Sequence, residues 1–341
     1  MPLISIVIPV YNAELFLNYS LQSIINQTFT DWECLVINDG STDDSLNIIT
    51  NYANKDNRIR CITIPHGGNA SIPRAKGVKE ALGKWIVYFD ADDALSSDYL
   101  SKMVSKSLEF DVDILLGRMV MYDSTLNNID NNSIPNVSFD MHQIMNGIDA
   151  FLLTIGDWII GCNGMMVKAN LFKSHLKEGN YINSDELNSR ILLYYARKVA
   201  FCDVNYNYRI VDSSITHKIS TKLYERLFVD AQLEEFIAQK FNRDSSISQR
   251  IRKVRFDAIL YWQQEYWETR RTYSKTERIK IFKIIKENYN TQDRRSLKIE
   301  FDSHSRFWKM AYLSNYLFFY LSSTFGHSYL KKIGLYLKKI I

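Results

Sequence analysis

The sequence predicts an α/β protein with an open, mostly parallel sheet flanked by helices, followed by a helical C-terminal extension. Two observations predict this fold. Residues 1–116 alternate apolar runs with segments of helical periodicity, which is the pattern of successive βα units. From about residue 223 the spacing is helical and the composition strongly basic. We therefore expect one domain over 1–220, with halves 1–116 and 117–220, and a basic helical region over 221–341.

The elements of the first half follow one another in order. Leu3–Val10 is a continuous apolar and β-branched run, as expected for a strand buried on both faces. Glu14–Gln27 then places its apolar residues at helical spacing. The alternation continues with strands at Glu33–Asn38, Arg60–Ile64, Lys84–Phe89 and Asp113–Leu116, and with helices at Asp43–Ala53, Ala70–Leu82 and Asp98–Phe110.

Composition excludes several classes of protein. With 46% hydrophobic and 23% charged residues, the chain is globular and not disordered. The four cysteines form no Cys-x-x-Cys pair, which argues against a zinc site or a disulfide framework. Met1–Ser5 lacks the basic region of a signal peptide, and no run of about 20 apolar residues is present. These features favour a cytoplasmic location.

The net charge of +4 conceals an asymmetry, because residues 217–341 hold 25 of the 42 Lys and Arg but only 13 of the 38 Asp and Glu. Two interpretations remain open: a solvated helical surface, or a surface that faces an anionic partner. Tyr329–Ile341 has an apolar side and a lysine side at helical spacing. Such a helix binds anionic membrane surfaces, although a terminal helix packed on the core is the alternative. We expect peripheral attachment to the inner face of the cell membrane and no nucleic-acid partner.

Acidic residues follow two of the predicted strands. Asp39 comes directly after one strand, and three aspartates within Asp90–Asp93 come after another. Ligands of open α/β sheets bind beyond the carboxyl ends of strands, so these carboxylates should meet at one edge. Their mutual repulsion would be relieved by a hard divalent cation bound together with substrate phosphates. The structural alternative is a solvated acidic turn that caps the next helix.

Two other nucleotide-binding classes are disfavoured. The turn after the first strand, Pro9–Glu14, contains no glycine, whereas a dinucleotide-binding fold needs Gly-x-Gly-x-x-Gly there. A sugar nucleotidyltransferase would need a Gly-rich, Arg-containing loop at the same place, and that loop is missing as well.

Residues 3–116 resemble the nucleotide-binding half of family 2 inverting glycosyltransferases, which have the GT-A fold. Four ordered segments carry the resemblance: Ser5–Asn12, Val36–Ser45, Gly67-Gly68 with Pro73–Gly77, and Phe89–Asp93. It implies a Rossmann-like GT-A sheet, a UDP-sugar donor and a divalent cation, Mn²⁺ or Mg²⁺. It also implies a glycan or lipid-linked saccharide acceptor, as in bacterial polysaccharide assembly.

The resemblance also implies roles for individual donor-site residues. Pro9, Tyr11 and Asp39 would hold the uracil and the ribose, with Asp39 accepting a hydrogen bond from the base. Arg74 lies in the segment that the family uses near the diphosphate and sugar. Lys76 stands where an asparagine is usual, so its role is not carried over.

The metal site is implied in the same way. Asp90 and Asp92 correspond to the Asp-x-Asp pair of the family, with Asp90 near the ribose and donor sugar. Asp92 would bind the cation that bridges the diphosphate. His217 stands where many GT-A enzymes place a metal or diphosphate contact.

Asp185 is the residue that the resemblance assigns as general base, which takes the proton of the acceptor hydroxyl. The family has Glu-Asp at the start of a helix, and here Ser184 replaces that glutamate. Glu186 is the alternative base, and an acidic first turn that suits the helix dipole is the structural alternative. Asp157 and Trp158 are candidates for the acceptor side.

The expected activity is the transfer of one sugar with inversion, which forms a β-linked product. Processive synthases of the family carry Gln-x-x-Arg-Trp and membrane spans, whereas Gln263–Trp267 lacks the arginine. The alternative is a degenerate, non-catalytic member that binds a nucleotide or a partner, which the departures at Lys76 and Ser184 keep open.

Overall fold

The protein divides into two compact units, Met1–Lys218 and Ile219–Ile341, in a computed structural model. The structure describes residues 1–123, 144–155, 163–176, 184–211 and 220–292. Each unit has a hydrophobic core of its own.

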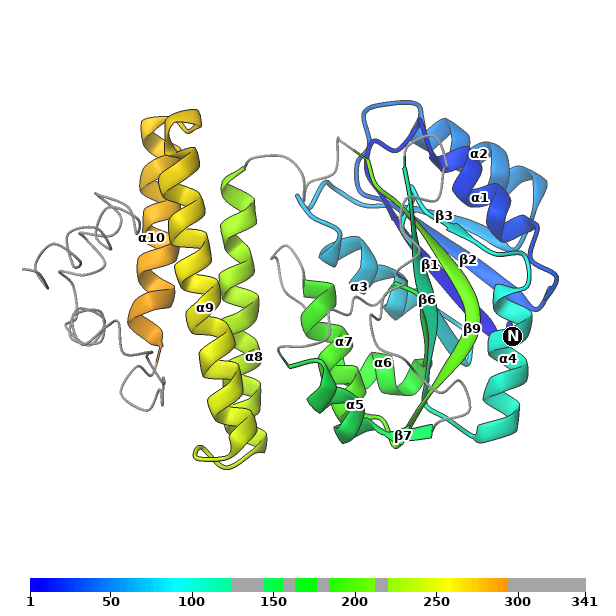
Figure 1. The fold of residues 1–341 in the computed structure, drawn as a ribbon. Coiled ribbons are helices and arrows are strands. Elements are labelled where there is room, and N and C mark those ends of the chain that lie inside the picture. The colour runs from blue at the N-terminus through cyan, green and yellow to red at the C-terminus, as the bar shows by residue number, and fades with distance from the viewer. Residues whose placement is uncertain (124–143, 156–162, 177–183, 212–219, 293–341) are drawn as a thin grey trace, which may run out of the picture. The chain divides into compact units, whose positions relative to one another are not determined.

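The first unit is built on one sheet, with nine strands in its described residues. Its first half is parallel, in the order β3 (Ile59–Thr63), β2 (Trp32–Asn38), β1 (Ile4–Val10) and β4 (Trp85–Tyr88). β8 (Met165–Lys168) runs antiparallel between β4 and β6 (Ile114–Tyr122), and β6 pairs in parallel with β9 (Lys198–Arg209). The short strands β5 (Ala94–Leu95) and β7 (Ile144–Asn146) are antiparallel to β9 (Figure 1). The predicted α/β sheet is thus confirmed, with parallel pairing throughout its first half and mixed pairing in its second half.

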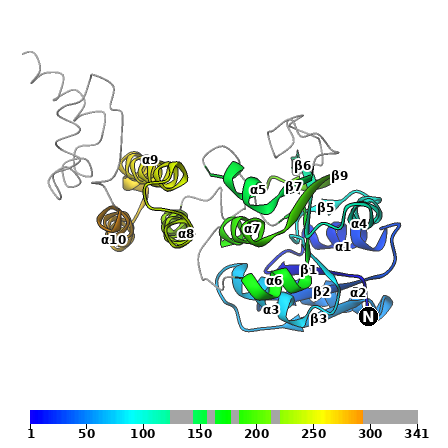
Figure 2. The same cartoon turned by 90° about the horizontal axis from the view of Figure 1, so that it is seen from below.

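Helices cover both faces of this sheet (Figure 2). One face carries α1 (Leu17–Ile25), α2 (Ser45–Lys55) and α4 (Tyr99–Phe110). The other face carries α3 (Ser71–Glu80), α5 (Gly147–Leu153), α6 (Ala169–His175) and α7 (Ser184–Tyr195). The apolar run of β1 is buried along its whole length because helices lie on both of its sides.

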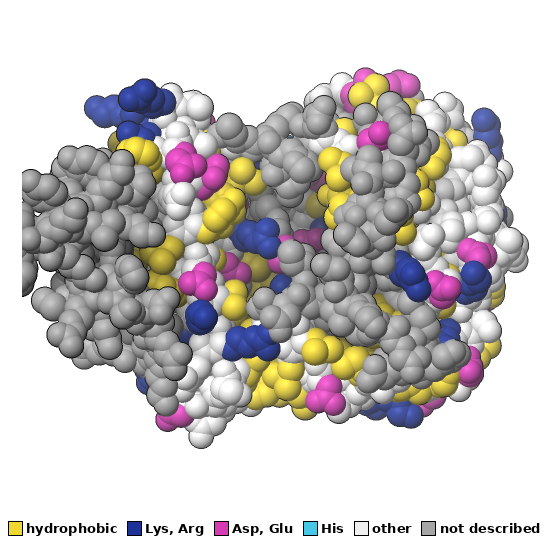
Figure 3. Space-filling model, in the orientation of Figure 1, with side chains coloured by type: hydrophobic (Ala, Val, Ile, Leu, Met, Phe, Trp, Pro, Cys, Tyr) yellow, Lys and Arg dark blue, Asp and Glu magenta, His cyan; other side chains and the backbone are white. Residues whose placement is uncertain are grey.

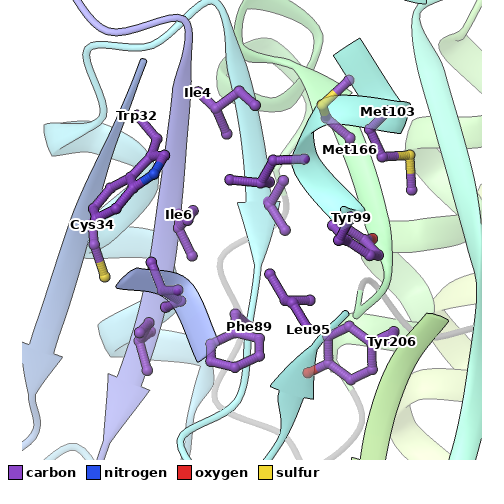
Figure 4. Close-up of a cluster of buried hydrophobic side chains, with 14 of the residues drawn as sticks. Ile4, Ile6, Trp32, Cys34, Phe89, Leu95, Tyr99, Met103, Met166 and Tyr206 are labelled. Atoms are coloured by element: carbon purple, nitrogen blue, oxygen red, sulfur yellow. The ribbon is translucent and has the colours of Figure 1, made fainter. Parts of the chain in front are cut away.

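The main core lies between the sheet and α1, α2 and α4. Successive strand residues point to opposite faces, so Ile4 and Ile6 share this side with Trp32 and Cys34 of β2. Figure 4 shows these side chains with Phe89, Tyr99 and Tyr206, which continue the cluster toward the other end of the sheet. The acidic turn after Phe89 is therefore anchored at a rigid edge of the core.

On the opposite face of the sheet, Gly77 allows α3 to pack closely on β1. A β-carbon at this position would lie 2.2 Å from Cγ1 of Val7, so only glycine lets the helix pack this closely on β1. Arg74 lies about one helical turn earlier and is also buried. The packing of α3 thus determines where the guanidinium of Arg74 lies.

The second unit is described as three α-helices with two short 3₁₀ segments. They are η1 (Thr221–Glu225), α8 (Arg226–Lys240), α9 (Ser246–Thr269), η2 (Arg270–Thr272) and α10 (Lys275–Thr291). Ser274 and Glu277 form a capping box that starts α10. Buried Arg255 donates to Glu234 at 2.6 Å and to the Asn288 carbonyl oxygen at 3.1 Å, so one guanidinium joins all three helices.

The described helices of this second unit carry charges of both signs, with 15 Lys and Arg and 10 Asp and Glu in residues 220–292. Basic and acidic side chains are interspersed on the face seen in Figure 3. The predicted membrane-binding helix, Tyr329–Ile341, lies outside the described residues.

Among the described helices, none is both long enough and apolar enough to cross a membrane.

Candidate active site

The first part of the site is the pair of loops that follow β1 and β2. Asp39, directly after β2, has a side chain that is 3% exposed. Its Oδ1 accepts from the backbone N–H of Gly67 at 2.8 Å, and its Oδ2 lies 2.9 Å from Nδ1 of His66. The His66 ring stacks on Tyr11, with centroids 3.9 Å apart and an interplanar angle of 16°. Tyr11 and Asp39, two predicted donor-binding residues, are therefore linked through His66.

The two loops are also joined by Asn12, which follows Tyr11 and has a φ of 49°. Its Oδ1 accepts from the backbone N–H of Thr42 at 2.8 Å, and its own N–H donates to Ser41 Oγ at 3.1 Å. Pro9 is buried within β1, where it is paired with Ile37. Pro9 thus supports the loop that presents Tyr11.

The second part of the site is the acidic turn after β4. Asp90 Oδ1 accepts from Arg74 at 2.6 Å, and Oδ2 accepts from Nδ2 of Asn163 at 2.5 Å. The hydroxyl of Tyr206 accepts from the backbone N–H of Asp90 at 3.1 Å. Three long-range contacts thus hold the carboxylate and backbone of Asp90 in place.

Asp93 serves the fold. Its buried carboxylate accepts from the Tyr206 hydroxyl at 2.5 Å and from the backbone N–H of Arg209 at 2.9 Å. Burial, followed by the charges of Asp92 and Asp90, raises the pKa of Asp93 well above its usual value. Asp93 therefore fastens the acidic turn to β9.

Asp92 differs from both neighbours, because no hydrogen bond to its carboxylate comes from any other residue that the structure describes. Arg209 holds only its backbone, donating from Nε to the Asp92 carbonyl oxygen at 2.9 Å. Burial and the charge of Asp90 raise the pKa of Asp92 to about 6. A half-buried carboxylate with this raised pKa is a place where a bound cation would stabilise the ionised form.

Arg74 connects the acidic turn to α7. Nη2 of Arg74 contacts Asp90, and Nη1 lies 3.7 Å from Oδ2 of Asp185 in the first turn of α7. Burial alone would lower the pKa of Arg74, but the two carboxylates outweigh it and raise the pKa above its usual value. The pKa of Asp185 is raised by burial, which the charge of Arg74 only partly offsets. The predicted base thus lies beside the predicted donor site.

The two departures from the family pattern leave this arrangement intact. Lys76 pairs with Glu80 at 2.5 Å on its own helix, and Ser184 is buried as the first residue of α7. Glu186 pairs with Arg190 at 3.3 Å, again within one helix. The structure therefore brings Asp185, and not Glu186, into contact with Arg74.

Sequence reasoning missed His66, Asn163, Tyr206 and Arg209. His66 follows β3, a strand end of the kind that marks ligand sites, and this position was the available signal. The other three lie more than 70 residues from the acidic turn, so no local pattern predicts their contacts with it. Asp157, Trp158 and His217, predicted for the acceptor and metal, lie outside the described residues.

Comparisons with known proteins find glycosyltransferases among the relatives of this chain. GlyA of Streptococcus pneumoniae serotype 4, described as a glycosyltransferase, is 28% identical over 236 residues, which cover 68% of this chain and 34% of GlyA. A poly(ribitol-phosphate) beta-glucosyltransferase of Bacillus spizizenii is 39% identical over 120 residues, which cover 34% of this chain and 19% of that protein. This chain therefore spans about a third or less of the length of these two relatives.

A solved structure shows the same fold. S. aureus TarS, residues 1–349 in complex with UDP-GlcNAc, aligns with a TM-score of 0.59 and 16% identity over 86% of this chain and 82% of that chain. The sheet and its flanking helices thus define a protein of the GT-A fold. Residues 5–173 match the family model for glycosyl transferase family 2, and the chain belongs to this family.

Proposed function

We propose that this protein transfers a single sugar from a UDP-sugar to a saccharide or lipid-linked saccharide acceptor, with inversion and with Asp185 as the general base. One observation carries the proposal: Arg74 lies between Asp90 of the acidic turn and Asp185 of α7. This arrangement unites a donor-side carboxylate and a candidate base in one site. The fold shared with a TarS structure in complex with UDP-GlcNAc supports the choice of donor.

Asp185 has the properties that the base step requires. It takes the proton of the acceptor hydroxyl while that oxygen bonds to the anomeric carbon, and UDP leaves with the electrons of the broken C–O bond. Burial raises the pKa of Asp185, which makes it a stronger proton acceptor than an exposed aspartate. Arg74 donates to Asp90 and lies beside Asp185, and these contacts restrict where the Asp185 carboxylate can lie.

The proposal includes a divalent cation at Asp92, and the residues present fit one. The Asp92 carboxylate receives no hydrogen bond from any other described residue, and its pKa of about 6 reflects burial beside Asp90. The described residues contain no group of three or more His, Cys, Asp or Glu side chains that could hold a metal. Diphosphate oxygens would therefore complete the ligand set, and His217 is a further candidate. The cation would supply charge stabilisation for the departing diphosphate.

The acceptor assignment rests on the relatives. The Bacillus spizizenii relative is named a poly(ribitol-phosphate) beta-glucosyltransferase, and ribitol is a sugar alcohol. We infer a saccharide acceptor for this chain, with Asp157 and Trp158 on the acceptor side. Aromatic rings stack on sugar faces, which suits Trp158 to that role.

A donor screen tests the proposal. The full chain is incubated with Mn²⁺ and, separately, with the UDP derivatives of glucose, galactose, N-acetylglucosamine and N-acetylgalactosamine, and released UDP is measured. We expect one of these donors to yield UDP at least about tenfold faster than the others, because a site that hydrogen-bonds sugar hydroxyls rejects epimers. Calorimetry with UDP and Mn²⁺ runs in parallel. Binding of UDP without turnover of any donor or acceptor would replace the proposal by the non-catalytic alternative.

A further inference from the structure

Ser20, a buried residue of α1, contacts the backbone of the acidic turn. Its hydroxyl oxygen lies 2.8 Å from the carbonyl oxygen of Ala91 and 2.7 Å from that of Asp93. A serine inside a helix often donates to the carbonyl oxygen four residues earlier, but here that atom, on Phe16, is farther away at 3.3 Å. A hydroxyl has one proton to donate, so Ser20 directs it to the two carbonyl oxygens of the turn.

The carbonyl oxygen between these two also has a partner, because Nε of Arg209 donates to the Asp92 carbonyl oxygen at 2.9 Å. The Ala91 carbonyl lies in the peptide plane before Cα of Asp92, and the Asp92 carbonyl lies in the plane after it. Because peptide groups are planar, holding both carbonyls restricts φ and ψ of Asp92, and with them the direction of its Cα–Cβ bond. No other described residue hydrogen-bonds the Asp92 carboxylate, so its place depends on this backbone.

We propose that Ser20 is a positioning residue for the cation site at Asp92, because its hydroxyl fixes the backbone of the turn and so holds the carboxylate in place before the cation binds. This assignment rests on the divalent cation of the proposed function. A ligand group that is already held in place loses less conformational freedom on binding, which strengthens the binding. Without the Ser20 hydroxyl, the Ala91 carbonyl loses this donor, and the peptide before Asp92 is less restrained.

Ser23, one turn later on the same helix, provides a matched control. Its hydroxyl donates to the Ser20 carbonyl oxygen at 2.7 Å and accepts from the backbone N–H of Leu95 at 3.3 Å, just beyond the acidic turn. Ser23→Ala therefore removes a hydroxyl that contacts the same stretch of chain, but it leaves the contacts of Ser20 with the turn in place. Alanine has the highest helix propensity, so α1 should form in both Ser20→Ala and Ser23→Ala.

The test measures the dissociation constant of UDP by calorimetry on the full chain, with and without Mn²⁺. In the wild type, Mn²⁺ should tighten UDP binding by at least about tenfold, because the cation would bridge Asp92 and the diphosphate. In Ser20→Ala this gain should fall below about threefold, with the affinity for UDP alone within about twofold of the wild type. Ser23→Ala should keep the wild-type gain. Urea unfolding curves establish that both variants are folded under the conditions of the titration.

Two outcomes would overturn the assignment to Ser20. One is an undiminished gain from Mn²⁺ in Ser20→Ala, which would show that the Asp92 carboxylate does not depend on this hydroxyl. The other is an equal loss of the gain in Ser20→Ala and Ser23→Ala, which would reflect a general loosening of the contacts of α1. A wild type whose UDP affinity does not respond to Mn²⁺ would instead overturn the proposed cation, and this assignment with it.

Discussion

The three aspartates of the acidic turn share one sequence environment and have three different surroundings. Asp90 is held by Arg74 and Asn163, Asp93 is buried against Tyr206 and Arg209, and the Asp92 carboxylate receives no hydrogen bond from any other described residue. The difference comes from partners on distant elements. Of the three, Asp92 is therefore the candidate for binding a cation.

Asp92→Asn should remove the dependence of turnover on Mn²⁺. The amide keeps the shape of the carboxylate but not its charge, so we expect turnover with Mn²⁺ to fall by at least about 100-fold. UDP affinity in the variant should also stop depending on Mn²⁺. The control is Asp203→Asn, since the Asp203 side chain is 72% exposed and pairs with Arg118 at 3.1 Å. Full Mn²⁺-dependent activity in Asp92→Asn would contradict the metal assignment.

Asp185→Asn should remove the base. We expect kcat to fall by about 10²–10⁴-fold with UDP affinity nearly unchanged, because general base catalysis contributes in this range. Glu186→Gln is the matched control, since Glu186 pairs with Arg190 on its own helix. Similar losses in both variants would leave the base unassigned between them, and a larger loss in Glu186→Gln would reverse the assignment.

The same site predicts a pH dependence. Burial raises the pKa of Asp185 above the usual aspartate value, and only the ionised form accepts a proton. Activity should therefore decline as the pH falls through this raised pKa, at a higher pH than for an exposed aspartate. A pH profile of kcat measures this acid limb. An acid limb that persists unchanged in the residual activity of Asp185→Asn would assign it to another group.

At the scale of elements, an ionic cluster joins the second half of the sheet. Asp113, just before β6, accepts from Nη2 of Arg197 at 2.7 Å, from the backbone N–H of Arg197 at 2.8 Å and from Lys168 at 2.9 Å. Lys168 ends β8, and Arg197 precedes β9. The cluster thus ties the ends of three neighbouring strands together.

Asp113→Asn should destabilise the first unit by about 1–2 kcal/mol at neutral pH, the usual range for hydrogen bonds to charged groups when a partner is exposed. Burial would raise the pKa of Asp113, but Arg197 and Lys168 outweigh it and hold the pKa below its usual value. The stabilisation is therefore complete above the unfolded pKa of about 3.9 and is lost as the pH falls through the lower folded pKa. Urea unfolding at several pH values measures this stabilisation. An unchanged unfolding midpoint of Asp113→Asn at neutral pH would contradict the prediction.

At the scale of the whole molecule, the two units differ in their balance of basic and acidic residues. Residues 220–292 of the second unit carry 15 basic and 10 acidic residues, and further lysines lie in Tyr329–Ile341. We propose that this last segment attaches the protein to an anionic membrane surface, which would bring the active site to a lipid-linked acceptor. Each lysine near such a surface contributes about 1 kcal/mol.

A variant with glutamine at four lysines of this segment should therefore bind anionic vesicles at least about tenfold more weakly, even though salt screens part of the attraction. The four positions are Lys331, Lys332, Lys338 and Lys339. The apolar side of the segment is unchanged in this variant. Cosedimentation with anionic vesicles is the measurement, and neutral vesicles are the control. Equal binding of the variant and the wild type would remove the membrane proposal.

The sequence by itself determined the α/β class and the parallel strands β1, β2 and β4, because a strand buried on both faces needs a local apolar run. It also located the carboxylates at strand ends. The antiparallel insertion of β8 between β4 and β6 was not predictable in this way, since the pairing joins segments about 80 residues apart. The tertiary structure alone separated Asp92 from Asp93 and placed His66 over Tyr11. Burial and hydrogen bonding to distant residues decide the role of a carboxylate or an imidazole. The residues adjacent in the chain determine neither the burial nor these hydrogen bonds.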